Sequence, residues 1–96
     1  TIQARALRDP EFRRGLLKES IETMLAGDIE TGKIILRDYI NSTIGFEKLG
    51  AVTQKSPKSL MRMFSPSDNP TAKNLFSIIY TLQKKEGVQL EVQTSR

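Results

Sequence analysis

The chain has 96 residues, of which 38% are hydrophobic and 27% are charged. This length predicts one domain with a compact core, too small for a deep catalytic cleft. Cysteine and histidine are absent, so the most common nucleophiles, general bases and transition-metal ligands are missing. We therefore expect no enzyme, no cofactor and no metal site, and the lack of cysteine fits a reducing cytoplasm. No run approaches the roughly 20 apolar residues of a membrane span, so no membrane partner is expected.

The net charge of +4 is distributed unevenly. Residues 1–47 carry seven basic and eight acidic groups, whereas residues 48–73 carry five basic groups and one acidic group. The positive excess therefore lies in the middle of the chain, where a polyanion would be bound. A basic solvated face is the alternative interpretation, and charge alone does not separate the two.

Two amphipathic helices are predicted in the first half of the chain. The residues through position 8 form an arm or the fraying start of a helix, and Asp9-Pro10 then begins a helix that stops at Gly27. Asp28 caps a second helix, whose apolar stripe runs from Ile35 to Ile40 and which ends at residues 41–43. Both stripes predict core or interface contacts.

Two short helices joined by a polar turn are predicted between residues 46 and 64. The first runs from about residue 45 to residue 52, with Thr43 as its cap, and the turn follows at residues 53–55. Ser56-Pro57 opens the second, which runs to about Phe64. Gly50 is small where the helices would cross closely. This is a helix-turn-helix pattern, in which the first helix spans the phosphate backbone and the second enters the major groove of DNA.

The second short helix has two distinct faces on a helical wheel of about 100° per residue. Leu60 and Phe64 lie on one side, and basic residues without an acid lie on the other. Methionines in this helix are expected to fill gaps in the core. The residues predicted to contact base edges are Gln54, Lys58, Ser59 and Arg62. Those predicted to contact phosphates are Lys48, Lys55, Ser56 and Lys73. For any one of these cations alone, a solubilising charge is the alternative interpretation.

A fifth helix is predicted from Asn69-Pro70 or Thr71 to Gly87, with Phe76 among the residues on its buried side. Residues 88–92 then alternate apolar and polar side chains, which predicts a short β-strand. A lone strand must pair with a second copy or with another protein. The two tyrosines are expected to be core aromatics with a wetted hydroxyl rather than platforms for nucleotide stacking.

Several stretches resemble the antidote proteins of bacterial addiction modules, which are helix-turn-helix antitoxins of the phage-repressor-like class paired with RelE-like toxins. The likeness covers residues 28–92, and residues 10–26 are similar to the leader helix of one subgroup. Two positions depart from the pattern: Gln54 stands where glycine is frequent, so the turn needs a positive φ or another shape, and Lys55 stands where an apolar residue is usual. The stretches that carry the resemblance are Asp38–Asn41, Gly45–Leu49, Ser56–Met63, Asn69-Pro70 and Leu75.

Together, the residues and the resemblance predict an all-α fold, a five-helix phage-repressor-like helix-turn-helix domain with a short C-terminal β-strand. The expected parts are an arm and leader helix (1–27), the helix-turn-helix domain with its strand (28–93) and a tail (94–96). The resemblance implies a homodimeric transcriptional repressor that binds double-stranded operator DNA and a RelE-like toxin in the bacterial cytoplasm, associated with the nucleoid when it is bound to DNA. Two alternatives stay open: a stand-alone phage-like regulator, and a protein-interaction module without DNA reading.

Overall fold

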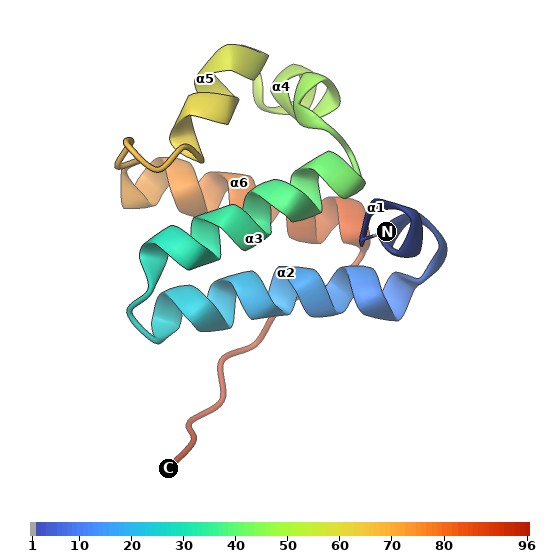
Figure 1. Ribbon diagram of the computed structural model, residues 1–96, viewed down its shortest axis with the longest axis vertical. Helices are drawn as coiled ribbons and strands as arrows, with labels where there is room; N and C mark the ends of the chain where they lie inside the picture. Colours follow the sequence, from blue (N-terminus) through green and yellow to red (C-terminus); the bar gives the residue numbers. More distant parts are fainter. Residues whose placement is uncertain (1) are drawn as a thin grey trace.

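Six α-helices make up the regular structure of this computed structural model, which describes the backbone of residues 2–96 and the side chains from residue 4 onward. Thr1, the first residue of the predicted arm, lies outside the described residues. The all-α class is confirmed, and Figure 1 shows the helices packed into one globule. The helices are α1 (Ile2–Arg8), α2 (Pro10–Leu25), α3 (Ile29–Ser42), α4 (Phe46–Thr53), α5 (Pro57–Met63) and α6 (Ala72–Glu86).

Helix α1 makes the count six rather than the predicted five. Ala6 is fully buried, and its carbonyl oxygen accepts a hydrogen bond from Nη1 of Arg13 in α2 at 3.0 Å. The guanidinium group of Arg5 lies 4.4 Å from the centre of the Phe12 ring. A helix of one or two turns is unstable alone and depends on such tertiary contacts. The sequence pattern of residues 1–8 therefore predicted only an arm or the fraying start of a helix.

Most helix boundaries follow the predicted capping residues. The side chains of Asp9, Asp28, Ser56 and Thr71 each accept a hydrogen bond from a backbone N–H in the first turn of the helix that follows. Gly87 ends α6 with φ 75°, the left-handed conformation that glycine adopts most easily. Capping is a local interaction, which explains why the sequence predicts these boundaries closely.

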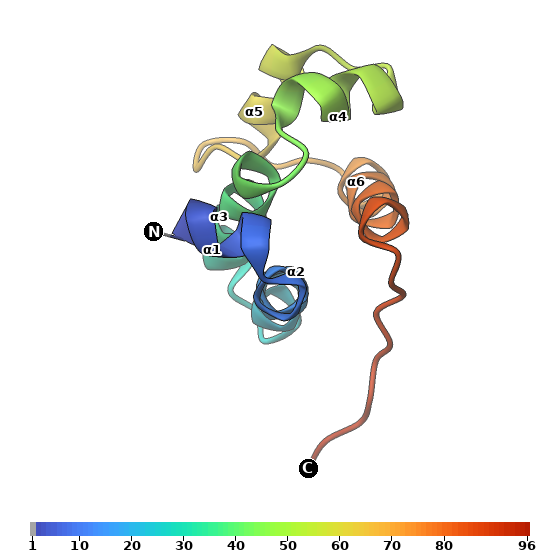
Figure 2. The ribbon, with the colours of Figure 1, turned by 90° about the vertical axis from the view of Figure 1, so that its right-hand side faces the viewer.

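The hydrophobic core lies between α2, α3, α4, α5 and α6 (Figures 1 and 2). Helices α2 and α3 approach closely at Gly32, where a Cβ atom would lie 2.9 Å from the carbonyl oxygen of Ser20 and would also meet the side chain of Met24. Among residues 2–96, no helix combines the length and apolarity needed to cross a membrane. The core residues are Leu17, Leu36, Tyr39, Ile40, Phe46, Leu49, Leu60, Met63, Phe64, Leu75, Ile78, Ile79 and Leu82.

A buried ion pair connects the two ends of the chain. The side chain of Glu86 in α6 is only 3% exposed and accepts hydrogen bonds from Nε of Arg13 at 2.9 Å and from the Tyr39 hydroxyl at 2.6 Å. Nε of Arg14 lies 3.7 Å from the same carboxylate. This cluster joins α2, α3 and α6. Tyr39 is the core aromatic that was predicted, but its hydroxyl is bound to Glu86 rather than wetted.

The predicted C-terminal β-strand is not confirmed. Within the described chain, residues 88–96 belong to no strand and run away from α6 as an extended segment (Figure 2). Val88 and Leu90 pack against the core, and their N–H groups donate to the carbonyl oxygen and to Oε1 of Gln83 at 3.1 and 2.7 Å. A β-ladder needs a second strand, and none is present among residues 2–96. The alternating pattern here serves packing against a helix.

Two aromatic residues of α6 were wrongly predicted to be buried. Phe76 is 61% exposed and Tyr80 is 59% exposed, while Ile78 and Ile79 point into the core. One helix buries only the stripe that faces its neighbours, and these rings lie one turn apart outside that stripe. Tyr80 is covered in part by Lys84, whose Nζ lies 5.4 Å from the ring centre.

Candidate nucleic-acid interface

The candidate site consists of α4, the turn at residues 54–56 and α5, which form the upper end of the molecule in Figure 1. Helix α4 begins after Gly45, which has φ 79° and makes no side-chain capping bond. Thr43, the predicted cap, instead donates its hydroxyl hydrogen to the carbonyl oxygen of Tyr39 at 2.7 Å. The start of α4 is therefore fixed by backbone conformation rather than by a capping side chain.

Helix α5 is held to the core by one apolar side. Leu60 is fully buried, and Met63 and Phe64 are 8% and 1% exposed. The ring of Phe64 packs against Phe46 of α4, with 6.1 Å between the ring centres. These contacts, predicted from the wheel for Leu60 and Phe64, fix the orientation of α5 and leave its other side facing solvent.

The turn between the two helices is unusually tight. The N–H of Lys55 donates to the carbonyl oxygen of Gly50 at 3.0 Å, and a Cβ atom on Gly50 would lie 2.6 Å from the carbonyl oxygen of Lys55. Gln54 adopts φ 59° and ψ 37°, so the first of the two turn shapes expected for this departure is the one found. A left-handed conformation costs a non-glycine residue about 1–2 kcal/mol, which the packing of α4 and α5 must offset.

We predict that Gly50→Ala lowers the free energy of unfolding by about 1–3 kcal/mol, because the added methyl group forces the turn away from α4. Urea denaturation measures this change. Gly15→Ala is the matched control, since a Cβ atom at this exposed position of α2 meets nothing within 4 Å and alanine favours helix. If Gly50→Ala is as stable as the parent chain, the close crossing is not a constraint.

The solvent side of α5 carries the residues predicted to contact bases. Lys58, Ser59 and Arg62 are all exposed. Met61 is also 47% exposed, so the prediction that it fills the core is wrong, whereas the same prediction holds for Met63. Met61 follows Lys58 by three residues and therefore lies on the same face, a spacing that the sequence itself contains.

The turn residues differ in their exposure and in whether their polar groups are already hydrogen-bonded. Gln54 is exposed and Lys55 is half-buried. The hydroxyl oxygen of Ser56 accepts the N–H of Ser59 at 3.1 Å, and the same hydroxyl donates to Oγ of Ser59 at 2.8 Å. The hydroxyl group of Ser56 is thus engaged in capping α5, while the hydroxyl hydrogen of Ser59 stays available for an acceptor.

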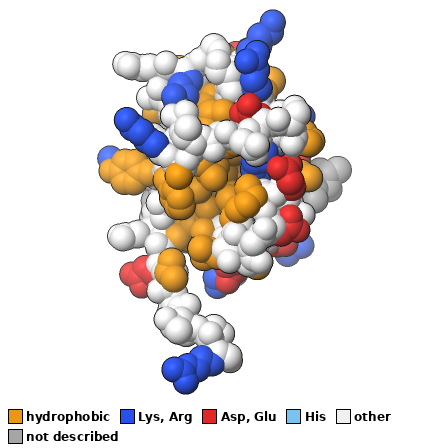
Figure 3. Space-filling view, turned by 90° about the vertical axis from the view of Figure 1, so that its left-hand side faces the viewer, with side chains coloured by type: hydrophobic (Ala, Val, Ile, Leu, Met, Phe, Trp, Pro, Cys, Tyr) orange, Lys and Arg blue, Asp and Glu red, His pale blue; other side chains and the backbone are white. Residues whose placement is uncertain are grey.

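Basic residues surround this face. Lys48 in α4 and Lys73 in the first turn of α6 are exposed. Five basic residues were predicted to contact DNA, and none of them forms an ion pair with another described residue. They are Lys48, Lys55, Lys58, Arg62 and Lys73. Glu47 is the only acid within α4 or α5. Figure 3 shows basic side chains projecting from this upper end of the molecule.

Comparisons of this chain with known protein families, with curated proteins and with solved structures find no match in any of the three. Residues 2–96 form an all-helical protein with six helices.

Proposed function

We propose that this chain is a sequence-specific DNA-binding repressor with a helix-turn-helix of the phage-repressor-like class. The observation that carries this proposal is the exposed, ion-pair-free edge formed by Lys58 and Arg62 on a helix that Leu60 anchors from behind. A helix held in this way presents a rigid basic edge, which is what the major groove admits.

The proposed contacts follow from the chemistry of each side chain. Arg62 donates two hydrogen bonds to a guanine, Lys58 and Gln54 donate to base-edge acceptors, and the free hydroxyl of Ser59 does the same. Met61 supplies apolar contact to a thymine methyl group. The residues assigned to the phosphate backbone, which position the helix without reading sequence, are Lys48, Lys55, Ser56 (through its backbone N–H) and Lys73.

The second part of the proposal rests on the resemblance of residues 28–92 to addiction-module antidote proteins. The chain then acts as the antitoxin of a type II toxin–antitoxin module in the bacterial cytoplasm. It represses its own operator as a homodimer and binds a RelE-like toxin. Dimerisation doubles the DNA surface that is read, because each subunit occupies one half-site.

The test compares two alanine variants by fluorescence anisotropy with specific and non-specific duplexes at several salt concentrations. Arg62→Ala should lower affinity for the specific duplex by about 1–3 kcal/mol and relax the preference at one base pair. Lys55→Ala should weaken binding to both duplexes and reduce the salt slope by about 1. Arg37→Ala, at an exposed position of α3, is the control. Unchanged binding by both test variants would reject the proposed interface.

A further inference from the structure

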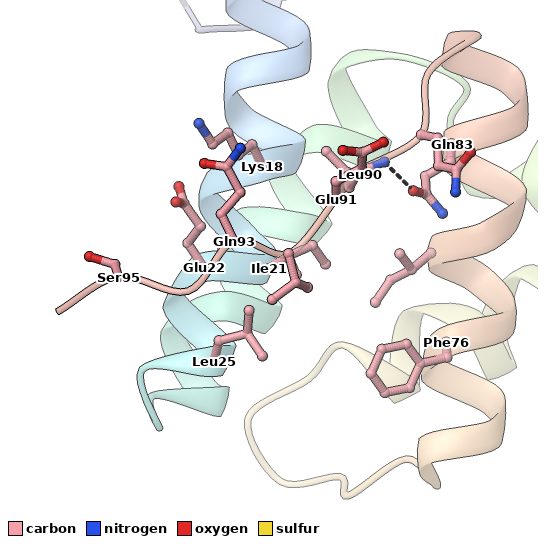
Figure 4. Close-up of a pocket in the computed structure, with 13 residues that line it drawn as sticks. Lys18, Ile21, Glu22, Leu25, Phe76, Gln83, Leu90, Glu91, Gln93 and Ser95 are labelled. Carbon is pink, nitrogen blue, oxygen red and sulfur yellow. Dashed lines mark hydrogen bonds between the residues drawn. The ribbon is translucent and has the colours of Figure 1, made fainter.

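An apolar groove lies at the other end of the molecule, between α2, α6 and the segment after Gly87. It has a volume of about 600 Å³ and is lined by Ile21 and Leu25 from α2, Phe76 from α6 and Leu90 from the segment (Figure 4). Phe76 and Leu25 are 61% and 67% exposed. Figure 3, which views the molecule from the left-hand side of Figure 1, shows a broad hydrophobic area in its middle. Such exposed side chains around a groove indicate an interaction surface.

The segment at the rim of the groove has an unused backbone edge. The N–H groups of Val88 and Leu90 are bonded to Gln83 on α6. Among residues 2–96, the N–H groups of Gln89, Glu91 and Gln93 have no acceptor. This edge can accept a further strand by the same hydrogen bonding that extends a β-sheet.

The charge of the rim argues against a second copy of this chain as its occupant. Glu22 and Glu91 outnumber Lys18 there, so a symmetric contact between two copies would bring two net-negative rims together.

Charge around the groove favours a basic occupant. Glu22 and Glu91 line it together with a single cation, Lys18. The rim is therefore net negative, although the whole chain carries +4. Charges of opposite sign across an interface speed association and select the partner.

We propose that this groove binds a basic, extended segment of a different protein, which pairs as a strand with residues 88–93 and buries its apolar side chains against Phe76 and Leu25. The inference goes beyond the proposed DNA-binding function and does not depend on it. Because α5 lies at the other end of the molecule, the chain can hold such a partner and DNA at the same time.

The probe for this site is a fluorescein-labelled peptide of about ten alternating Val and Lys residues, compared with a Val and Glu peptide of the same length. Anisotropy titrations of the full chain should show saturable binding, about tenfold tighter for the lysine peptide. Backbone amide exchange should slow at Gln89, Glu91 and Gln93 when the lysine peptide binds. Glu91→Lys should remove the preference between the peptides, and Glu11→Lys, at an exposed position of α2 outside the groove, should not.

Phe76→Ser should weaken binding of the lysine peptide by about tenfold, as expected when one anchoring side chain is lost. Tyr80→Ser is the matched control, because Tyr80 is similarly exposed on the same helix and lies outside the groove. The proposal is overturned if neither peptide saturates, if both bind equally, or if the two serine variants behave alike. It is also overturned if sedimentation shows that Phe76→Ser turns a dimer into a monomer, because the occupant would then be a second copy.

Discussion

Replacing Glu86 with Gln is expected to lower the free energy of unfolding by about 3 kcal/mol, the lower end of the range for a broken buried ion pair. The carboxylate is 3% exposed, and its replacement by an amide leaves the guanidinium group of Arg13 without its anionic partner. Arg13 keeps 23% of its side chain in solvent, which limits the penalty. Urea denaturation at neutral pH measures the change.

The same substitution should change how stability depends on pH. Burial raises the pKa of Glu86, but hydrogen bonds from Arg13 and Tyr39 and the charges of Arg13 and Arg14 outweigh this effect, so the pKa lies below its ordinary value. An unfolded glutamate titrates near ~4.3. The stabilisation is therefore fully present above that pH and is lost as the pH falls through the lower folded value. In Glu86→Gln this part of the acid-induced loss should be absent.

Ionisation of the Tyr39 hydroxyl group makes stability fall as the pH rises, whereas protonation of Glu86 makes it fall as the pH drops. Burial and the hydrogen bond to Glu86 raise the pKa of Tyr39 above its ordinary value. Its contribution to stability is present below about pH 10, where an unfolded tyrosine begins to ionise, and is lost as the pH rises further.

The control for Glu86→Gln is Glu91→Gln, which removes an exposed carboxylate and should change stability by no more than about 0.5 kcal/mol. A Glu86→Gln variant as stable as this control would contradict the assigned role.

The sequence predicts those parts of the fold that depend on local interactions. Asp9, Asp28 and Ser56 cap their helices as expected, because a capping bond spans only two or three residues. The exposed edge of α5 follows from helical periodicity in the same way. The burial of Phe76 was wrongly predicted because periodicity identifies apolar residues but not which of them a neighbouring helix covers.

Contacts between distant residues could not be predicted. The bond from Tyr39 to Glu86 joins residues 47 positions apart, and the bond from Arg13 to Glu86 spans 73 positions. No local pattern marks these partners, since isolated charged residues on helices are usually solvated. Helix α1 was predicted only as an arm or the fraying start of a helix for a related reason, because it is stabilised by packing rather than by its own sequence.

Lys33 is a second buried charge, and it connects the core to the loop that follows α5. Its side chain is 1% exposed, and its Nζ donates to the carbonyl oxygens of Ser65 and Asp68 at 3.0 and 2.6 Å. The carboxylate of Glu30, one turn earlier on α3, lies 3.4 Å away. The ammonium group thus fixes the backbone at two points between α5 and α6.

Lys33→Met is expected to lower the free energy of unfolding by about 2–3 kcal/mol, because methionine fills a similar volume but leaves both loop carbonyl groups without their charged donor. Amide exchange should become faster at residues 65–68 before the rest of the core opens, since only this loop loses its anchor. Arg37→Met is the matched control, because it removes an exposed charge from the same helix. If the two variants are equally stable, Lys33 is only a buried side chain that the core tolerates, and the orientation of α5 then depends on the packing of Leu60, Met63 and Phe64.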